Sequence, residues 1–204
     1  MPKNFVSNSR ESSRMFKSNL LESLSKVHFT VPLIIFIPVI GYFSWKALIP
    51  GQLSVILFLA YFLAGLFIWT LTEYVMHRFV FHFTPRGKLM ERIHFIFHGV
   101  HHDYPNDANR LVMPPSVSIP LATGFYFLFC LFLSEYVVSA FFSGFIFGYL
   151  FYDMTHYALH HANFKNRFWK NLKKHHMTHH YSNSEKGYGV SSNFWDKIFG
   201  SDFL

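Results

Sequence analysis

The residues best suited to chemistry in this sequence are its histidines. Of the 14 histidines, all but His28 lie between positions 77 and 180. They form four groups: His77 with His82; His98, His101 and His102; His156, His160 and His161; and His175, His176, His179 and His180. Imidazole binds iron, zinc, copper and nickel. So many imidazoles within about a hundred residues predict a metal centre, rather than separate histidines each satisfied by a local hydrogen bond.

The spacing within the groups fits helices. Residues at i, i+3 and i+4 share one face of a helix. The spacing His98, His101, His102 recurs as His176, His179, His180, and His156 and His160 form an i, i+4 pair. Each group could therefore aim two or three ring nitrogens at one point. His77 and His82 are five residues apart, which turns them away from each other on an α-helix, so they need different metals or a helix end between them.

Long apolar runs must position these groups. The composition is 51% hydrophobic and 21% aromatic but only 14% charged, whereas a soluble domain carries about 25% charged residues. Four uncharged runs occupy residues 29–45, 53–72, 117–134 and 136–152. Each is near the length of about 17–25 residues that crosses a bilayer. The sequence predicts an all-α integral membrane protein with four transmembrane helices in two hairpins. The second hairpin is just long enough to cross twice, and could instead enter deeply without emerging.

The charges predict the orientation. The net charge is +7, yet the basic residues flank the apolar runs, which indicates lipid headgroups rather than nucleic acid. If both hairpins enter from one side, all of the 18 basic residues except Lys46 share that side. The N-terminus, the C-terminus and the histidine groups are then predicted on the cytoplasmic side. We expect a basic arm at 1–28, followed by one membrane-embedded domain at 29–204. The single cysteine, Cys130, excludes an intrachain disulfide and a thiolate cluster.

A polyhistidine site beside the headgroups could act on lipid chains. Breaking an unactivated C–H bond needs a redox metal, because no side chain can do it alone. Two imidazole-bound irons with O2 and two electrons could insert a hydroxyl group or form a double bond. Zinc could replace iron in recombinant material, since it binds such sites more tightly. Glu73 and Asp153 precede His77 and His156 by four and three residues. Each could accept the second ring N–H of its histidine, or be an ordinary polar residue at a helix end.

The four histidine groups read HRFVFH (77–82), HGVHH (98–102), HYALHH (156–161) and HHMTHH (175–180). Together they resemble the fatty acid hydroxylase superfamily of membrane di-iron enzymes, and most closely its fatty acid 2-hydroxylases. The segments RLVMPP (110–115) and NFWDKIFGS (193–201) support this resemblance, which covers about residues 60–204. It implies four transmembrane helices under a cytosolic helical cap. It also implies hydroxylation at carbon 2 of a fatty acyl chain, free or within a sphingolipid.

The resemblance further implies ten metal ligands: His77, His82, His98, His101, His102, His156, His160, His176, His179 and His180. His94, His161 and His175 fall outside those positions and would support the ligands or be bystanders. Eukaryotic members commonly carry a fused haem domain that delivers electrons. The arm at 1–28 is too short for one, so we expect a separate electron-transfer protein.

Two alternatives remain at this point. The histidine groups alone do not separate a fatty acid hydroxylase from a desaturase or a sterol or carotenoid hydroxylase. A membrane metal transporter or metal-binding protein belongs to a different class. Transport sites usually lie near the middle of the bilayer, whereas the four apolar runs contain no histidine. Nucleic-acid binding by the basic stretch 165–174 has little support, because this stretch fits the membrane surface better.

Overall fold

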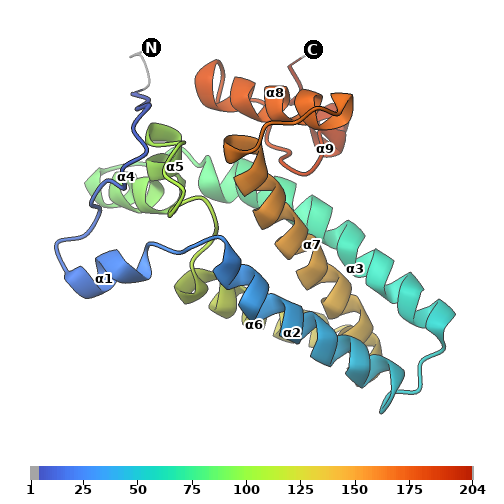
Figure 1. Ribbon diagram of the computed structural model, residues 1–204. Helices are drawn as coiled ribbons and strands as arrows, with labels where there is room; N and C mark the ends of the chain where they lie inside the picture. Colours follow the sequence, from blue (N-terminus) through green and yellow to red (C-terminus); the bar gives the residue numbers. More distant parts are fainter. Residues whose placement is uncertain (1–4, 204) are drawn as a thin grey trace.

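The computed structural model describes residues 5–203, which form helices and connecting segments without a β-strand (Figure 1). Residues 1–4 of the predicted arm, including Lys3, and Leu204 lie outside the described residues. The helices are α1 (Asn19–Leu24), α2 (Thr30–Leu48), α3 (Val55–Val75), the π-helix η1 (Met76–Phe81), α4 (Lys88–His94), the π-helix η2 (Phe95–Gly99), α5 (Val100–Asp103), α6 (Pro115–Cys130), α7 (Glu135–His161), α8 (Arg167–Tyr181) and α9 (Phe194–Ile198).

Four apolar helices correspond to the four predicted runs. Three are long and apolar enough to cross a membrane: Thr30–Leu48, Val55–Phe81 and Glu135–His161. The third run was predicted to continue to Ser134, but α6 ends at Cys130 after 16 residues, about 24 Å of helix. It ends early because the chain turns there to place Ser134 at the N-cap of α7. α7 in turn continues well past the predicted end at 152 and carries His156 and His160.

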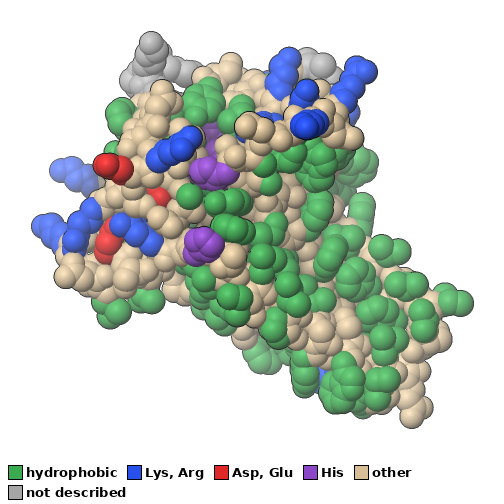
Figure 2. Space-filling model, viewed as in Figure 1, with side chains coloured by type: hydrophobic (Ala, Val, Ile, Leu, Met, Phe, Trp, Pro, Cys, Tyr) green, Lys and Arg blue, Asp and Glu red, His purple; other side chains and the backbone are tan. Residues whose placement is uncertain are grey.

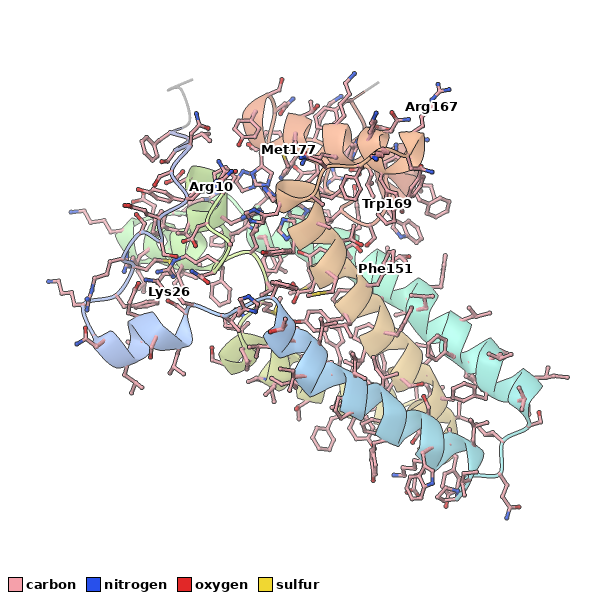
Figure 3. All side chains as sticks on the ribbon, viewed as in Figure 1. Arg10, Lys26, Phe151, Arg167, Trp169 and Met177 are labelled. Carbon is pink, nitrogen blue, oxygen red and sulfur yellow. The ribbon has the colours of Figure 1, made fainter. Side chains whose placement is uncertain are left out.

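The apolar helices expose large hydrophobic side chains. Ile34, Ile56 and Phe132 are 70%, 80% and 77% exposed, and hydrophobic side chains cover the elongated part of the surface in Figure 2. An apolar surface of this extent is stable against lipid rather than water. With its apolar helices, the chain is an integral membrane protein. Most of its Lys and Arg side chains lie towards the opposite end, as Lys26 beside α1 and Arg167 at the start of α8 illustrate (Figure 3).

Glycines bring α3 and α7 into direct contact. A Cβ atom at Gly65 would lie 1.9 Å from the carbonyl oxygen of Phe141, and one at Gly144 would lie 1.9 Å from that of Phe62. The two backbones therefore touch at this crossing, as small residues allow in membrane helices. α7 also packs along α2, so it is the central helix of the bundle (Figure 1).

The described part of the N-terminal arm is bound to the segment that follows α5. The Arg110 guanidinium donates to the Glu22 carboxylate at 2.7 Å and to the Ser13 carbonyl at 2.7 Å. Val27 N–H donates to the Asn109 carbonyl at 2.9 Å. Burial acts to raise the pKa of Glu22, but the hydrogen bonds from Lys26 and two backbone amides, with the charge of Arg110, lower it to about 2. The arm is thus packed against the cap, which consists of α4, α5, α8 and α9 (Figure 1).

Candidate metal centre

The ten histidines predicted as ligands come together in two groups of five. The first group contains His77, His82, His98, His102 and His179, and the second contains His101, His156, His160, His176 and His180. Within each group, one ring nitrogen from every histidine lies within 4.8 Å of all the others. The first group joins η1 and the residue after it to η2, α5 and α8, and the second joins α5 to α7 and α8. The cap helices and the membrane helices therefore meet at these rings.

The two groups are neighbours. The ring of His102 in the first group stacks on that of His180 in the second, with centroids 4.3 Å apart. His101 and His102 are adjacent in the chain, and so are His179 and His180, and each pair divides between the groups. Two cations bound here, one in each group, would therefore lie close together.

Helix geometry explains how each sequence motif is divided. His98 with His102, His156 with His160, and His176 with His180 are i, i+4 pairs, and each pair lies in one group. His101 and His179, the i+3 members, turn towards the other group. The spacing allowed two or three imidazoles of each motif to meet at one point, and in both motifs two of them do. The i, i+4 partners converge, while the third residue supplies the adjacent group.

A π-helix brings His77 and His82 together. Their spacing predicts that they bind different metals or that a helix end lies between them. They belong to the same group, with ring centroids 5.0 Å apart, so the first alternative was wrong. η1 closes with an i→i+5 hydrogen bond from His82 N–H to the His77 carbonyl at 3.1 Å, and it ends at Phe81. The wider π turn aligns residues five apart, and π turns often mark functional sites.

The nitrogens in the first group face each other in a way that a bound cation would satisfy. The His77 and His179 Nδ1 atoms lie against the carbonyl oxygens of Tyr188 and Lys186. Each Nδ1 must therefore carry the proton, which leaves a lone pair on Nε2. The Nε2 atom of His77 lies 3.1 Å from that of His98, and the Nε2 atom of His179 lies 3.0 Å from that of His82.

Ring protons cannot resolve all of these contacts. His98 Nε2 is also 3.0 Å from His102 Nε2, and one proton can point to only one of two neighbours. Protonation of both ring nitrogens is disfavoured, because burial lowers the pKa of His82 to about 2 and that of His179 to about 4. Converging, neutral imidazole nitrogens fit a bound metal ion.

Of the two alternatives given for Glu73, acceptance of the second ring N–H of His77 is not what the structure has. Its carboxylate accepts the backbone N–H groups of Val190 and Ser191, both at 2.8 Å, and the Ser191 hydroxyl. The change from α3 to η1 between Glu73 and His77 turns the His77 ring towards the carbonyl of Tyr188 instead. Glu73 thus fixes the segment that carries the acceptor of His77, rather than accepting the proton itself.

Asp153 likewise does not accept the second ring N–H of His156, the first of the two alternatives given for it. Its carboxylate accepts the Met113 backbone N–H at 3.2 Å and the Tyr149 hydroxyl at 3.1 Å. Tyr149 precedes Asp153 by one turn of α7, so the carboxylate turns along the helix and towards the start of α6 rather than to His156. Asp153 therefore fixes the chain before α6 against α7.

The three histidines expected to support the ligands or to be bystanders lie outside both groups. His94 packs edge-on against Phe83, with centroids 5.3 Å apart. His161 is exposed beside Tyr157. His175 donates to the Asp196 carboxylate at 3.2 Å.

Asp196 is a positioning residue that the sequence analysis did not single out. Its buried carboxylate accepts the N–H groups of Tyr188 at 2.9 Å and Gly189 at 2.8 Å, and the Ser201 hydroxyl at 2.8 Å. It therefore orients the peptide whose carbonyl binds His77. Its place inside the motif at 193–201 was the available signal.

The chain is similar to several known proteins. The fatty acid hydroxylase family matches residues 62–201. The chain belongs to this family. It is 43% identical over 187 residues to the ceramide very long chain fatty acid hydroxylase of Schizosaccharomyces pombe, covering 90% of this chain and 53% of that protein. A dihydroceramide fatty acyl 2-hydroxylase of Arabidopsis thaliana is 36% identical over 196 residues, covering 94% of this chain and 80% of that protein.

A solved structure of full-length Scs7p, in which only the hydroxylase domain is visible, superposes with a TM-score of 0.86 at 40% identity. The match covers 91% of this chain and 70% of that one. A fatty acid 2-hydroxylase of Rattus norvegicus is 37% identical over 207 residues, covering 91% of this chain and 55% of that protein. The chain spans about half the length of its fungal and mammalian relatives.

A large apolar cavity reaches the histidines of this hydroxylase-family chain. Its volume is about 860 Å³. His98, His101 and His156, from both groups, line it together with apolar residues of α1, η1 and α6. Such a cavity can hold an extended hydrocarbon chain and keep water from the metal ligands.

Proposed function

We propose that the chain catalyses O2-dependent hydroxylation of a fatty acyl chain at carbon 2, either free or within a sphingolipid. The observation that carries this proposal is the apolar cavity of about 860 Å³ that ends on His98, His101 and His156. Relatives named as fatty acid 2-hydroxylases and dihydroceramide fatty acyl 2-hydroxylases support the position of the reaction.

We assign one iron ion to each of the two groups of five histidines. Zinc could occupy these sites in recombinant protein. Bound iron would supply the cleavage of a C–H bond with O2. One oxygen atom enters the product, and two electrons and two protons convert the other to water. The ten histidines would hold the metals, and the carbonyl groups of Tyr188 and Lys186 orient two of the rings. The apolar walls would position the acyl chain and exclude water.

The four apolar helices would form two membrane hairpins under a cap on the cytoplasmic side. The concentration of Lys and Arg at the cap end of the molecule favours this orientation. Both termini and the metal centre would then lie on that side, with the arm at 1–28 along the surface of the domain at 29–204. Lys46 lies at the far end and pairs with Glu135 at 3.0 Å, which reduces the cost of a positive charge there. A separate electron-transfer protein would supply the electrons to the cap.

The test is lipid mass spectrometry of cells that express the wild-type chain or His98→Ala. The wild type should add one oxygen at carbon 2 of an acyl chain, and His98→Ala should abolish this product. His161→Ala is the matched control, because His161 is exposed and outside both groups. A double bond, or an oxidised sterol or carotenoid, would assign the chain to a different reaction of the superfamily. Metal uptake without oxidised lipid would favour a transporter.

A further inference from the structure

One face of α6 forms a wall of the cavity beside the metal centre. The residues on this wall are spaced by three or four positions, and they are Val117, Pro120, Leu121, Gly124, Phe125 and Leu128. This spacing places them on a single face of the helix. From Val117 to Leu128 the wall runs for about 16 Å along the helix axis.

The start of α6 is fixed next to the metal centre. The Met113 N–H is bonded to Asp153 of α7 at 3.2 Å, and Asp153 lies about one turn before His156. Positions farther along α6 therefore line the cavity progressively farther from the histidines. Gly124 is nine residues after Pro115, about 14 Å along the axis.

Gly124 lies in the middle of this wall and has no side chain to fill the space in front of it. A Cβ atom built there meets no heavy atom within 4 Å. This distinguishes it from Gly65 and Gly144, where a Cβ atom would overlap a facing backbone. Helix packing does not require a glycine at 124.

We propose that Gly124 keeps the far part of the cavity open and is thereby a specificity-determining residue for acyl-chain length. This inference rests on the proposed function, since it takes the occupant of the cavity to be an acyl chain that reacts near its carboxyl end. The reacting end would lie at His98, His101 and His156, and the methyl end would pass Gly124. A side chain at this position would displace the methylene groups beyond it, each of which is worth about fourfold in affinity when buried.

The first experiment compares Gly124→Ala, Gly124→Leu and Gly124→Phe against a series of acyl substrates graded in length. The ratio of long-chain to short-chain 2-hydroxy product should fall progressively with side-chain size, by more than tenfold for Phe, while bound metal stays at the wild-type level. Gly41→Phe is the matched control: Gly41 is also exposed on a helix with no neighbour within 4 Å of its built Cβ, but it does not line this cavity. Its product ratio should equal that of the wild type. An unchanged ratio in Gly124→Phe, or an equal loss at every chain length, overturns the inference.

A second experiment does not depend on catalysis. With Cys130→Ser removing the single native thiol, Gly124→Cys provides an accessible thiol for a maleimide. A long-chain fatty acid should slow this labelling at least tenfold, whereas a short-chain fatty acid should leave it unchanged. The same thiol at Gly41→Cys should label at one rate throughout. Equal protection by both acids, or by neither, overturns the inference. If the wild type forms no 2-hydroxy product but the Gly124→Cys variant shows length-dependent protection, the proposed reaction fails while the chain-length assignment stands.

Discussion

Replacing Glu73 tests whether a carboxylate in a membrane helix supports the first histidine group from a distance. Glu73 is 5% exposed and accepts the N–H groups of Val190 and Ser191. In Glu73→Ala both donors lose their acceptor, at about 1–3 kcal/mol for each buried donor, so we expect a loss of about 2–6 kcal/mol in stability. In Glu73→Gln one amide oxygen can still accept both backbone bonds. The amide nitrogen replaces the oxygen that accepts the Ser191 hydroxyl, so we expect a smaller loss of about 1–3 kcal/mol.

The effect should also reach the metal. The segment held by Glu73 contains Tyr188, whose carbonyl oxygen orients His77. Losing the partner of a metal-binding histidine typically lowers metal affinity by about 10–100-fold. Since Glu73 acts through the backbone, we expect about tenfold for Glu73→Ala at the first group and little change at the second. Chelator competition should then release one metal per chain before the other.

The assay is metal analysis of purified protein at graded chelator concentration, with thermal unfolding in detergent measured in parallel. Glu91→Ala is the control, because Glu91 is an exposed carboxylate on α4, away from the segment at 188–191. Glu73→Gln should lie between Glu73→Ala and the wild type in both measurements. Wild-type metal retention together with a wild-type unfolding temperature in Glu73→Ala would refute the reasoning.

Three further predictions concern packing, pH and metal removal. Gly144→Leu should destabilise the bundle by about 1–3 kcal/mol or more, because its side chain must push α7 away from the Phe62 carbonyl. Thermal unfolding measures this loss, and the control Gly41→Leu should keep the wild-type unfolding temperature. The pKa of Glu22 is lowered in the folded chain from 4.5 to about 2. The difference in free energy of unfolding between wild type and Glu22→Gln should therefore be largest above about pH 4.5 and shrink as the pH falls towards 2. A difference that grows on acidification would contradict this. Removing metal with a chelator should lower stability by about 4 kcal/mol for each of the two sites, relative to protein held with free metal at a thousandfold excess over its dissociation constant. The unfolding temperature should recover when metal is returned.

The sequence predicted the helices and the histidine set because both depend on local patterns. Uncharged runs located α2, α3, α6 and α7. Repeated spacing pointed to the histidine motifs, and the resemblance to the fatty acid hydroxylases selected from them the ten histidines that form the two groups. The division of each motif between the groups could not be read from the sequence. It depends on where neighbouring helices lie, and for His77 and His82 it depends on a π turn whose i→i+5 hydrogen bond has no sequence signature of its own.

The partners of Glu73 and Asp153 were beyond prediction for a different reason. Glu73 binds residues 117 and 118 positions away, and Asp153 binds one 40 positions away. A helical spacing of three or four residues suggests a neighbour on the same helix, but a buried carboxylate pairs with whichever unsatisfied N–H groups the fold brings to it. The same limitation applies to Gly65 and Gly144, since a glycine reveals a close helix crossing only when the facing helix is known.

The C-terminal segment and the membrane helix α3 form one structural unit around the first histidine group. Glu73 of α3 fixes Val190 and Ser191, Asp196 fixes Tyr188 and Gly189, and the carbonyl of Tyr188 orients His77. The Trp195 indole N–H donates to the Thr70 hydroxyl at 3.0 Å, which adds a second connection to the same helix. Any movement of α3 relative to the cap must therefore move the His77 ring. Because the cavity wall includes Met76 and Phe81 of η1, an acyl chain bound in the cavity would contact the short helix that carries His77. A change in how that acyl chain packs would then move the His77 ring.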